Sequence, residues 1–186
     1  MKYQCFILSN LAFTLLASLS SADKATDKMT VAEYLAEARG FQAEAEYEEA
    51  HSELYPAASH YSGVARFFEA GDEHDKAVAM HLVAAGAFQA EAEKNVAESD
   101  YVFAAIDYSE AATSFEAGGE HDKAVALHLR AAGAFQAWAE KCIAQGNLDY
   151  LASYYSKAAT SFKAGGEHEK AAENYSKAVK ACKDVK

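Results

Sequence analysis

The sequence predicts an all-α protein, an α-α superhelix of about three helix pairs with a leading single helix. Of its 186 residues 43 are Ala, whereas Ile, Val and Thr together number only 17. That balance disfavours strands, because β-branched residues suit the pleated surface of a sheet and Ala does not. An apolar fraction of 51% is sufficient for a hydrophobic core. The strongest indication of the fold is an internal repeat.

The repeat has a period of 47 residues. The sequence Gly-Asp-Glu-His-Asp-Lys at 71–76 returns with small changes at 118–123 and at 165–170. Residues 62–90 and 109–137 are identical at 22 of 29 positions. Such self-similarity is typical of proteins in which one structural unit is stacked several times.

The first 22 residues have the layout of a cleavable secretory signal. A basic residue, Lys2, precedes a mostly apolar stretch at 6–19, and small residues follow at Ser20 and Ala22. The apolar stretch is shorter than the roughly 20 residues of a membrane span. We therefore expect cleavage after Ala22, a short linker at 23–29, and an exported mature chain, periplasmic or extracellular, with no stable membrane insertion.

The predicted repeat domain, residues 30–186, begins with a leading helix at 30–50. This helix matches the second half of a unit whose first half is absent, because the repeat register extends backwards into it. Three units follow, at about 54–98, 99–145 and 146–186. The length of residues 30–186 is typical of a single folded domain.

Each unit is expected to form two antiparallel helices. The first carries two aromatic residues seven positions apart, as Tyr108 and Phe115 do, with small residues on the same face. It ends at a Gly-Asp or Gly-Gly pair, where glycine can supply the left-handed conformation of a helix C-cap. The second helix then continues to Glu98 or Gln145, and Asn147 is a candidate N-cap for the first helix of the last unit.

The spacing within each unit resembles the tetratricopeptide repeat. In the last unit the aromatic, small and glycine positions of that pattern are Tyr155, Ala158, Ala159, Phe162, Gly166, Ala171, Tyr175 and Ala178. The period of 47 exceeds the usual one of about 34 residues. In the other units His81 and His128 replace the ring of the second helix. The similarity is thus to tetratricopeptide-like solenoids with a long second helix.

That resemblance implies a concave groove lined by the first helices. The corresponding candidate partner-binding residues are Ser62, Arg66, Glu69, Ser109, Thr113, Glu116, Ser156, Thr160 and Lys163. Some members of the family clamp a peptide carboxylate with Lys and Asn side chains from successive first helices. That combination is absent from these positions, so chaperone C-terminal tails are not expected as ligands. Small hydroxyl side chains favour close approach by the backbone or a helix of a partner.

The leading helix offers a second candidate surface. If it packs only against the helix that follows it, its other side is uncovered. We expect that side to carry some of Val31, Tyr34, Leu35 and Phe41, an apolar stripe at helical spacing. Such a stripe could accept a partner at the open N-terminal edge.

No residue pattern indicates catalysis or a cofactor. His74 and His81 lie seven residues apart, about 10 Å along a helix, whereas metal ligands on one helix usually lie four apart. The sequence has one Glu-x-x-His, ending at His51, where a di-iron bundle requires two. Phosphate loops, nucleophile elbows and Cys-x-x-Cys are absent. We expect no enzyme, no cofactor and no metal site, and two free, partly buried thiols at Cys142 and Cys182.

The net charge of -11 disfavours binding to nucleic acids and anionic lipids. The sequence therefore favours an exported interaction module or scaffold that binds a peptide or helix of a partner protein. The alternative is a self-assembling structural repeat protein, a homo-oligomer whose similar units stack end to end between molecules. The lysine-rich last helix resembles a terminal cap, which disfavours open-ended polymers, but the acidic stretch 44–49 of one copy could still meet this basic helix of the next. A metal-binding protein or an enzyme is the third possibility.

Overall fold

The computed structural model describes residues 30–184, which form seven α-helices and no strand. In chain order the helices are α2 (Val31–Ala50), α3 (Leu54–Ala70), α4 (His74–Ala97), α5 (Tyr101–Ala117), α6 (His121–Ala144), α7 (Leu151–Ala164) and α8 (His168–Asp184). The predicted all-helical class is confirmed for these residues. The predicted signal at 1–22, its cleavage point after Ala22 and the linker at 23–29 lie outside the described residues.

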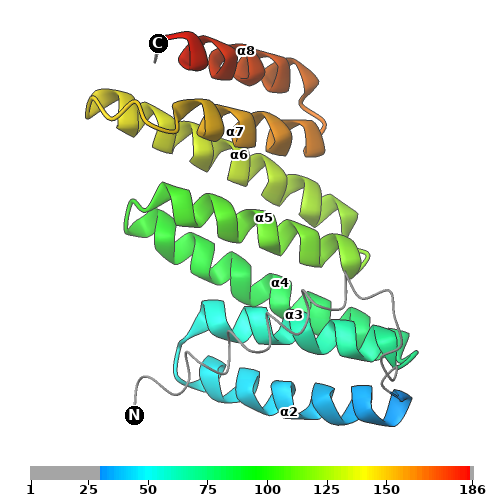
Figure 1. The fold of residues 1–186 in the computed structure, drawn as a ribbon. Coiled ribbons are helices and arrows are strands. Elements are labelled where there is room, and N and C mark those ends of the chain that lie inside the picture. Colours follow the sequence, from blue (N-terminus) through cyan, green and yellow to red (C-terminus); the bar gives the residue numbers. More distant parts are fainter. Residues whose placement is uncertain (1–29, 185–186) are drawn as a thin grey trace, which may run out of the picture. The chain divides into compact units, whose positions relative to one another are not determined.

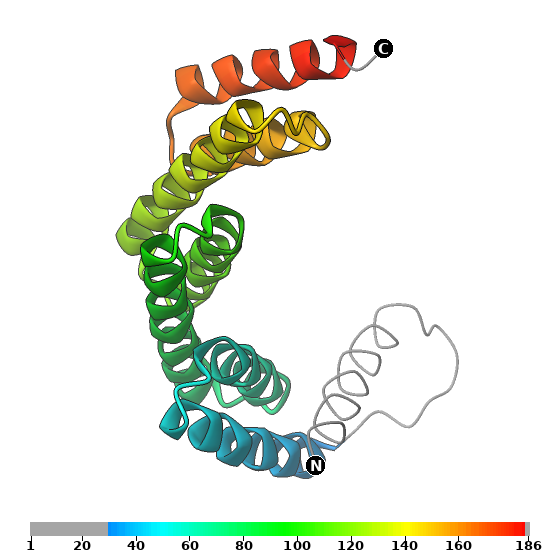
Figure 2. The same cartoon turned by 90° about the vertical axis from the view of Figure 1, so that its left-hand side faces the viewer.

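Each helix packs closely against the helices that precede and follow it in the chain. Figure 1 shows the row from α2 to α8 in chain order, and Figure 2 shows the same order after a quarter turn. Helices α3 with α4, α5 with α6 and α7 with α8 are the first and second helices of the three sequence units. Consecutive packing of this kind is what a helical repeat requires.

Small residues and aromatic rings form the core. The two aromatic positions of each first helix are buried, with exposed fractions of 4–8%, at Tyr61, Phe68, Tyr108, Phe115, Tyr155 and Phe162. The alanines between them, such as Ala111 and Ala112, are fully buried. These small side chains allow the helix axes to approach closely while the rings fill the remaining space.

The glycine pairs end the first helices as the sequence predicts, with one difference. The second member of each pair has the left-handed conformation, with φ of 81° at Gly119 and 80° at Gly166. In the first unit this position is Asp72, with φ of 57°, so an aspartate and not a glycine supplies the turn there. Aspartate tolerates that conformation better than most residues.

The first glycine of each pair receives a leucine from the preceding unit. A Cβ atom at Gly118 would collide with Leu82 of α4, and one at Gly165 would collide with Leu129 of α6. The same contact is looser at Gly71, where a Cβ atom would lie 3.1 Å from Leu35 Cδ2. The three leucines are 47 residues apart, so one contact recurs at every junction between units.

The start of the last unit departs from expectation. The N-cap predicted at Asn147 is wrong, because α7 begins at Leu151 and is preceded by Tyr150 with φ of 67°. The backbone N–H of Asn147 instead donates to Cys142 O at 2.9 Å and so closes the end of α6. Asn147 therefore terminates the helix before it and does not start the one after it.

Candidate functional site

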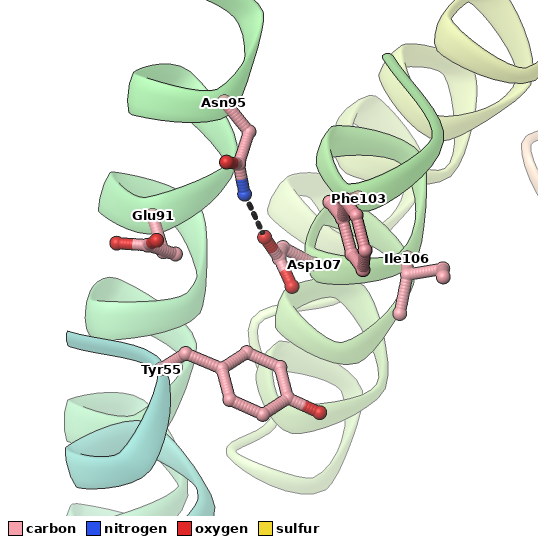
Figure 3. Close-up of a pocket in the computed structure, with 6 residues that line it drawn as sticks. All are labelled: Tyr55, Glu91, Asn95, Phe103, Ile106 and Asp107. Atoms are coloured by element: carbon pink, nitrogen blue, oxygen red, sulfur yellow. Dashed lines mark hydrogen bonds between the residues drawn. The ribbon is translucent and has the colours of Figure 1, made fainter. Parts of the chain in front are cut away.

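A pocket of about 400 Å³ opens between α4 and α5, near the start of α3. Its lining residues are Glu91 and Asn95 of α4, Phe103, Ile106 and Asp107 of α5, and Tyr55 of α3. Figure 3 shows Asp107 between Asn95 and Tyr55, with Phe103 beside it. Apolar walls with a few converging polar groups are typical of small-ligand sites, and the volume lies within their usual range.

Asp107 is the chemically distinctive residue of this pocket. Its exposed fraction is 2%, although it is a carboxylate, and Asn95 Nδ2 donates a hydrogen bond to its Oδ2 at 2.7 Å. Among the described residues, Asn95 is the one side chain that donates to this carboxylate. Burial raises the pKa of Asp107 to about 6, and the negative charges of Glu91 and Glu110 contribute to that rise.

Two aromatic residues flank the pocket. Tyr55 and Phe103 have exposed fractions of 46% and 56%, which is unusually high for large rings. The Tyr55 ring also meets Phe88 edge to face, with 5.7 Å between centroids. Burial raises the pKa of Tyr55, and Glu110 and Asp107 raise it further, so the tyrosine stays neutral in a negative environment.

Glu91 faces away from the centre of the pocket. Its carboxylate Oε1 accepts a hydrogen bond from Lys94 Nζ at 3.1 Å, one helical turn further along α4. In Figure 3 the carboxylate is turned away from Asp107. Asp107 is therefore the carboxylate that points toward a ligand in the pocket.

The first junction, between α2 and α3, has a histidine in contact with two glutamates at the equivalent positions. Moving back 47 residues from Glu91, Asn95 and Asp107 leads to Glu44, Glu48 and His60. His60 Nδ1 lies 2.7 Å from Glu48 Oε2, and His60 Nε2 lies 3.8 Å from Glu44 Oε2. A basic side chain on the first helix thus faces two carboxylates on the second helix of the preceding unit.

The third junction, between α6 and α7, is filled by rings. Moving forward 47 residues from Glu91, Asn95 and Asp107 leads to Trp138, Cys142 and Tyr154. Trp138 and Tyr154 meet edge to face with 6.2 Å between centroids, and Cys142 is buried beside them. The pocket between α4 and α5 thus occupies the space that two aromatic side chains fill in the next junction.

The structure places the predicted groove residues on three helices. Ser62, Ser109 and Ser156 are half-buried, whereas Arg66, Glu69, Thr113, Glu116, Thr160 and Lys163 are exposed. None of them lines the pocket between α4 and α5. Helices α3, α5 and α7 pack more closely against α4, α6 and α8 than against one another. We call these nine residues the first-helix strip.

Several side chains of the first-helix strip already have partners within the protein. Thr113 Oγ1 donates to Ser109 O, and Thr160 Oγ1 donates to Ser156 O, each at 3.0 Å. Such bonds to the preceding turn are typical of threonine within a helix. They use the hydroxyl hydrogens within the two helices, and Thr160 Oγ1 also lies 3.4 Å from the hydroxyl oxygen of Tyr175 in α8.

The two strip glutamates pair with histidines of the second helices. His81 Nε2 lies 3.2 Å from Glu69 Oε1, and His128 Nε2 lies 3.5 Å from Glu116 Oε1. His81 is buried and His128 is half-buried, at the aromatic position of the repeat pattern. These contacts join the two helices of one unit.

The N-terminal stripe is not on the uncovered side of α2, which corrects our expectation. Phe41 stacks on Phe67 of α3 with 5.5 Å between centroids, and Tyr34 lies 6.4 Å from the same ring. Leu35 contacts Gly71, as described above. Val31, with an exposed fraction of 49%, is the exposed member of the four. Helical periodicity predicted the stripe but not the neighbour it contacts.

The described residues also bear on metal binding, membrane crossing and the state of the cysteines. No group of three or more His, Cys, Asp or Glu side chains in residues 30–184 could hold a metal ion. No helix in that range combines the length and the apolar character that crossing a bilayer demands. The thiols of Cys142 and Cys182 are free, but the first is buried and the second exposed, so neither is partly buried as expected.

The pocket was missed in the sequence because a helical pattern treats aspartate as a surface residue. The signal that could have revealed it is a comparison of units position by position. Asp107 stands where the neighbouring units have His60 and Tyr154, and Glu91 of the first unit stands where the second unit has Trp138. Residues that depart from their equivalents in an otherwise repetitive chain mark the positions with local chemistry.

No family model and no curated protein matches this sequence.

Proposed function

We propose that this protein is a tetratricopeptide-like interaction module that holds a peptide or helix of a partner protein. The proposal is supported by the 47-residue repeat, the stacking of consecutive helices and the aromatic and small residues at the pattern positions. Helical repeats of this kind present an extended surface built from one strip per unit. The fold alone does not identify the partner, so the chemistry of the partner has to be inferred from the exposed residues.

The observation that carries the proposal is the repetition of the first-helix strip. At each of three helices a half-buried serine is followed four residues later by an exposed polar residue: Arg66, Thr113 or Thr160. The spacing between equivalent residues is always 47. A surface that repeats in this way can contact successive segments of one extended partner.

The chemistry of the strip favours a partner that offers hydrogen-bond donors. The hydroxyl hydrogen of Thr113 is used within its own helix, so its oxygen remains as an acceptor, whereas the Thr160 oxygen also contacts the Tyr175 hydroxyl at 3.4 Å. Arg66 and Lys163 add positive charge at either end of the strip in an otherwise acidic chain. We expect a partner segment with exposed backbone N–H groups and acidic residues near its ends.

Site-specific photo-crosslinking tests this proposal. A benzophenone side chain placed at Thr113 or Thr160 is expected to crosslink one defined protein from the compartment in which the chain resides. The same group at Val78 or Val125, which are exposed at equivalent positions of α4 and α6, provides the matched control. Unlabelled protein is expected to compete with this crosslinking. Unlabelled protein that carries both Arg66→Glu and Lys163→Glu should no longer compete if the strip makes the contact. Equal crosslinking from all four positions would contradict it.

The proposed location is outside the cytoplasm. It rests on the signal-like sequence at 1–22. Sequencing of the mature N-terminus is expected to begin at Asp23. A mature protein that retains residues 1–22 would remove this part of the proposal.

One observation favours the alternative, a self-assembling repeat protein. On α8, Tyr175 and Val179 are exposed, whereas their equivalents His81 and Ala85 on α4 are buried. The face of α8 that carries Tyr175 and Val179 is therefore equivalent to a face of α4 that is covered within the chain. Sedimentation across a range of concentrations tests this: a shift to larger species that Val179→Lys abolishes would support assembly, and a monomer throughout would exclude it.

A further inference from the structure

At the first junction a hydrogen-bonded histidine takes the position that Asp107 has beside the α4–α5 pocket. Between α2 and α3, the carboxylate of Glu48 lies 2.7 Å from His60, and Glu44 lies on the other side of the same ring. His60 occupies the repeat position of Asp107. At the α4–α5 junction the position of Glu44 is again acidic, as Glu91. The position of His60 is taken by a second acid, Asp107.

Lys94 is the positive group that acts on Asp107, and it lowers the pKa of the aspartate less than burial raises it. Lys94, the basic residue of α4 nearest in sequence, forms an ion pair with Glu91 at 3.1 Å and is largely exposed. Across residues 30–184 no Lys, Arg or His forms an ion pair with Asp107. A buried carboxylate without an ion-pair partner is costly, and in a chain of net charge -11 the surrounding field attracts cations.

The geometry favours an ammonium group over a guanidinium group or a metal ion. Asn95 occupies one oxygen of Asp107, so the paired oxygens that a guanidinium prefers are not both available. Only one carboxylate points inward, which is too few ligands for a metal ion. The rings of Tyr55 and Phe103 can contact both the positive charge and an attached apolar chain.

We propose that the pocket between α4 and α5 binds a primary ammonium group on a slim apolar chain, with Asp107 as its ionic partner. The chemistry is that of a lysine side chain or of a free alkylamine. At about 100° per residue, Asp107 lies at least about a third of a turn around α5 from both Ser109 and Thr113 of the strip. This proposal is therefore independent of partner binding by the first-helix strip.

A titration of the full chain followed by nuclear magnetic resonance tests the proposal. The probe is n-pentylammonium, with n-pentanol as the uncharged control of the same length. Pentylammonium is expected to shift the side-chain amide signals of Asn95 and the methyl signals of Ile106 in a saturable way. Pentanol is expected to bind about tenfold more weakly or not at all, because it lacks the charge.

Three variants locate the binding. Asp107→Asn keeps the shape of the side chain and removes its charge, and it is expected to weaken pentylammonium binding about tenfold or more. Asp107→His copies the first junction and is also expected to abolish binding, since it places a base inside the pocket. The matched control is Glu110→Gln, which removes an exposed charge from the next turn of α5 and is expected to change affinity less than about threefold. Circular dichroism confirms that each variant remains folded.

A second probe distinguishes the two sources of the ammonium group. If Nα-acetyl-lysine methylamide binds more tightly than pentylammonium, the ligand is a lysine of another protein, and if it binds more weakly, the ligand is a free amine. Binding of equal strength supports the ammonium chemistry and assigns recognition to the charge and the first carbons alone. The proposal is overturned if neither probe shifts the Asn95 and Ile106 signals, or if Asp107→Asn and Glu110→Gln reduce affinity equally.

Discussion

The α4–α5 and α6–α7 junctions are built on the same frame of alanines but differ in what lies between them. Ala92 and Ala139 are equivalent and fully buried in both. At the α6–α7 junction Trp138 and Tyr154 fill the adjoining space, whereas at α4–α5 the equivalent residues are acidic and a pocket remains. Helix spacing is thus set by residues that repeat, and local chemistry is set by residues that do not.

The difference has an energetic side. Two aromatic rings bury a large apolar area and contribute their edge-to-face contact to the α6–α7 junction. The α4–α5 junction instead buries a carboxylate with one hydrogen bond, which opposes folding. We therefore expect stability to be concentrated at α6–α7 and ligand binding at α4–α5, in agreement with the common trade of stability for function.

The largest effect is expected when the aromatic junction is converted into the acidic one. The double substitution Trp138→Glu with Tyr154→Asp removes both rings and buries charge, so it should lower the free energy of unfolding by about 4 kcal/mol or more. Urea denaturation measures this.

The reciprocal control is Glu91→Trp with Asp107→Tyr, which copies the aromatic filling into the pocket. It should leave stability unchanged or raise it, because it removes a buried charge and fills a cavity. Similar losses in both double variants would show that the junctions are not alternative fillings of one frame.

A smaller effect is expected from the leucines at the junctions. Leu82→Ala should cost about 2–3 kcal/mol, because Leu82 is pressed against Gly118 in the middle of the row. Leu35→Ala should cost about 1 kcal/mol, because its contact with Gly71 is looser and, within residues 30–184, α2 packs closely against α3 alone. Thermal unfolding of the two variants gives the comparison. If both lose equal stability, α2 is as well supported as the central helices.

The sequence predicts the features that repeat. The helix pairs, the 24-residue second helices α4 and α6, and the buried rings all follow from apolar periodicity and from the glycine pairs. These features depend on local preference and on contacts that every unit makes in the same way. A helix predicted in one unit is therefore supported by the equivalent segments of the other units.

The features that failed depend on neighbours that periodicity does not identify. The apolar stripe with Leu35 and Phe41 was recognised, but its helix partner was not, although Leu82 and Leu129 at the same register indicate a contact with the following helix. Asn147 has the right side chain for an N-cap, yet its backbone closes α6. Asp107 was counted as a surface charge because its burial depends on two helices together.

The smallest expected effect concerns the charge of Asp107 and depends on pH. Burial raises its pKa to about 6 from the ordinary 3.8, so between these values the folded protein binds a proton that the unfolded chain does not. Stability contributed by this group is therefore highest below about pH 4 and falls as the pH rises to about 6, above which the full penalty remains. The other charged groups nearby are Glu91 and Lys94 of α4, Glu110 of α5 and, as a neutral tyrosine, Tyr55 of α3.

Asp107→Asn removes that penalty while leaving those neighbouring groups in place, so their titration largely cancels in the comparison with the unmodified protein. The variant should be more stable by about 1 kcal/mol at pH 7.5, an increase in melting temperature of roughly 2–4 °C, and equally stable at pH 4. Thermal unfolding of both proteins at the two pH values measures the difference. Glu110→Gln, which removes one of the lesser causes of the raised pKa and leaves Asp107 buried, should show a smaller change with pH. A gain from Asp107→Asn that is the same at pH 4 and pH 7.5 would show that the charge of the carboxylate is not what weakens the α4–α5 junction.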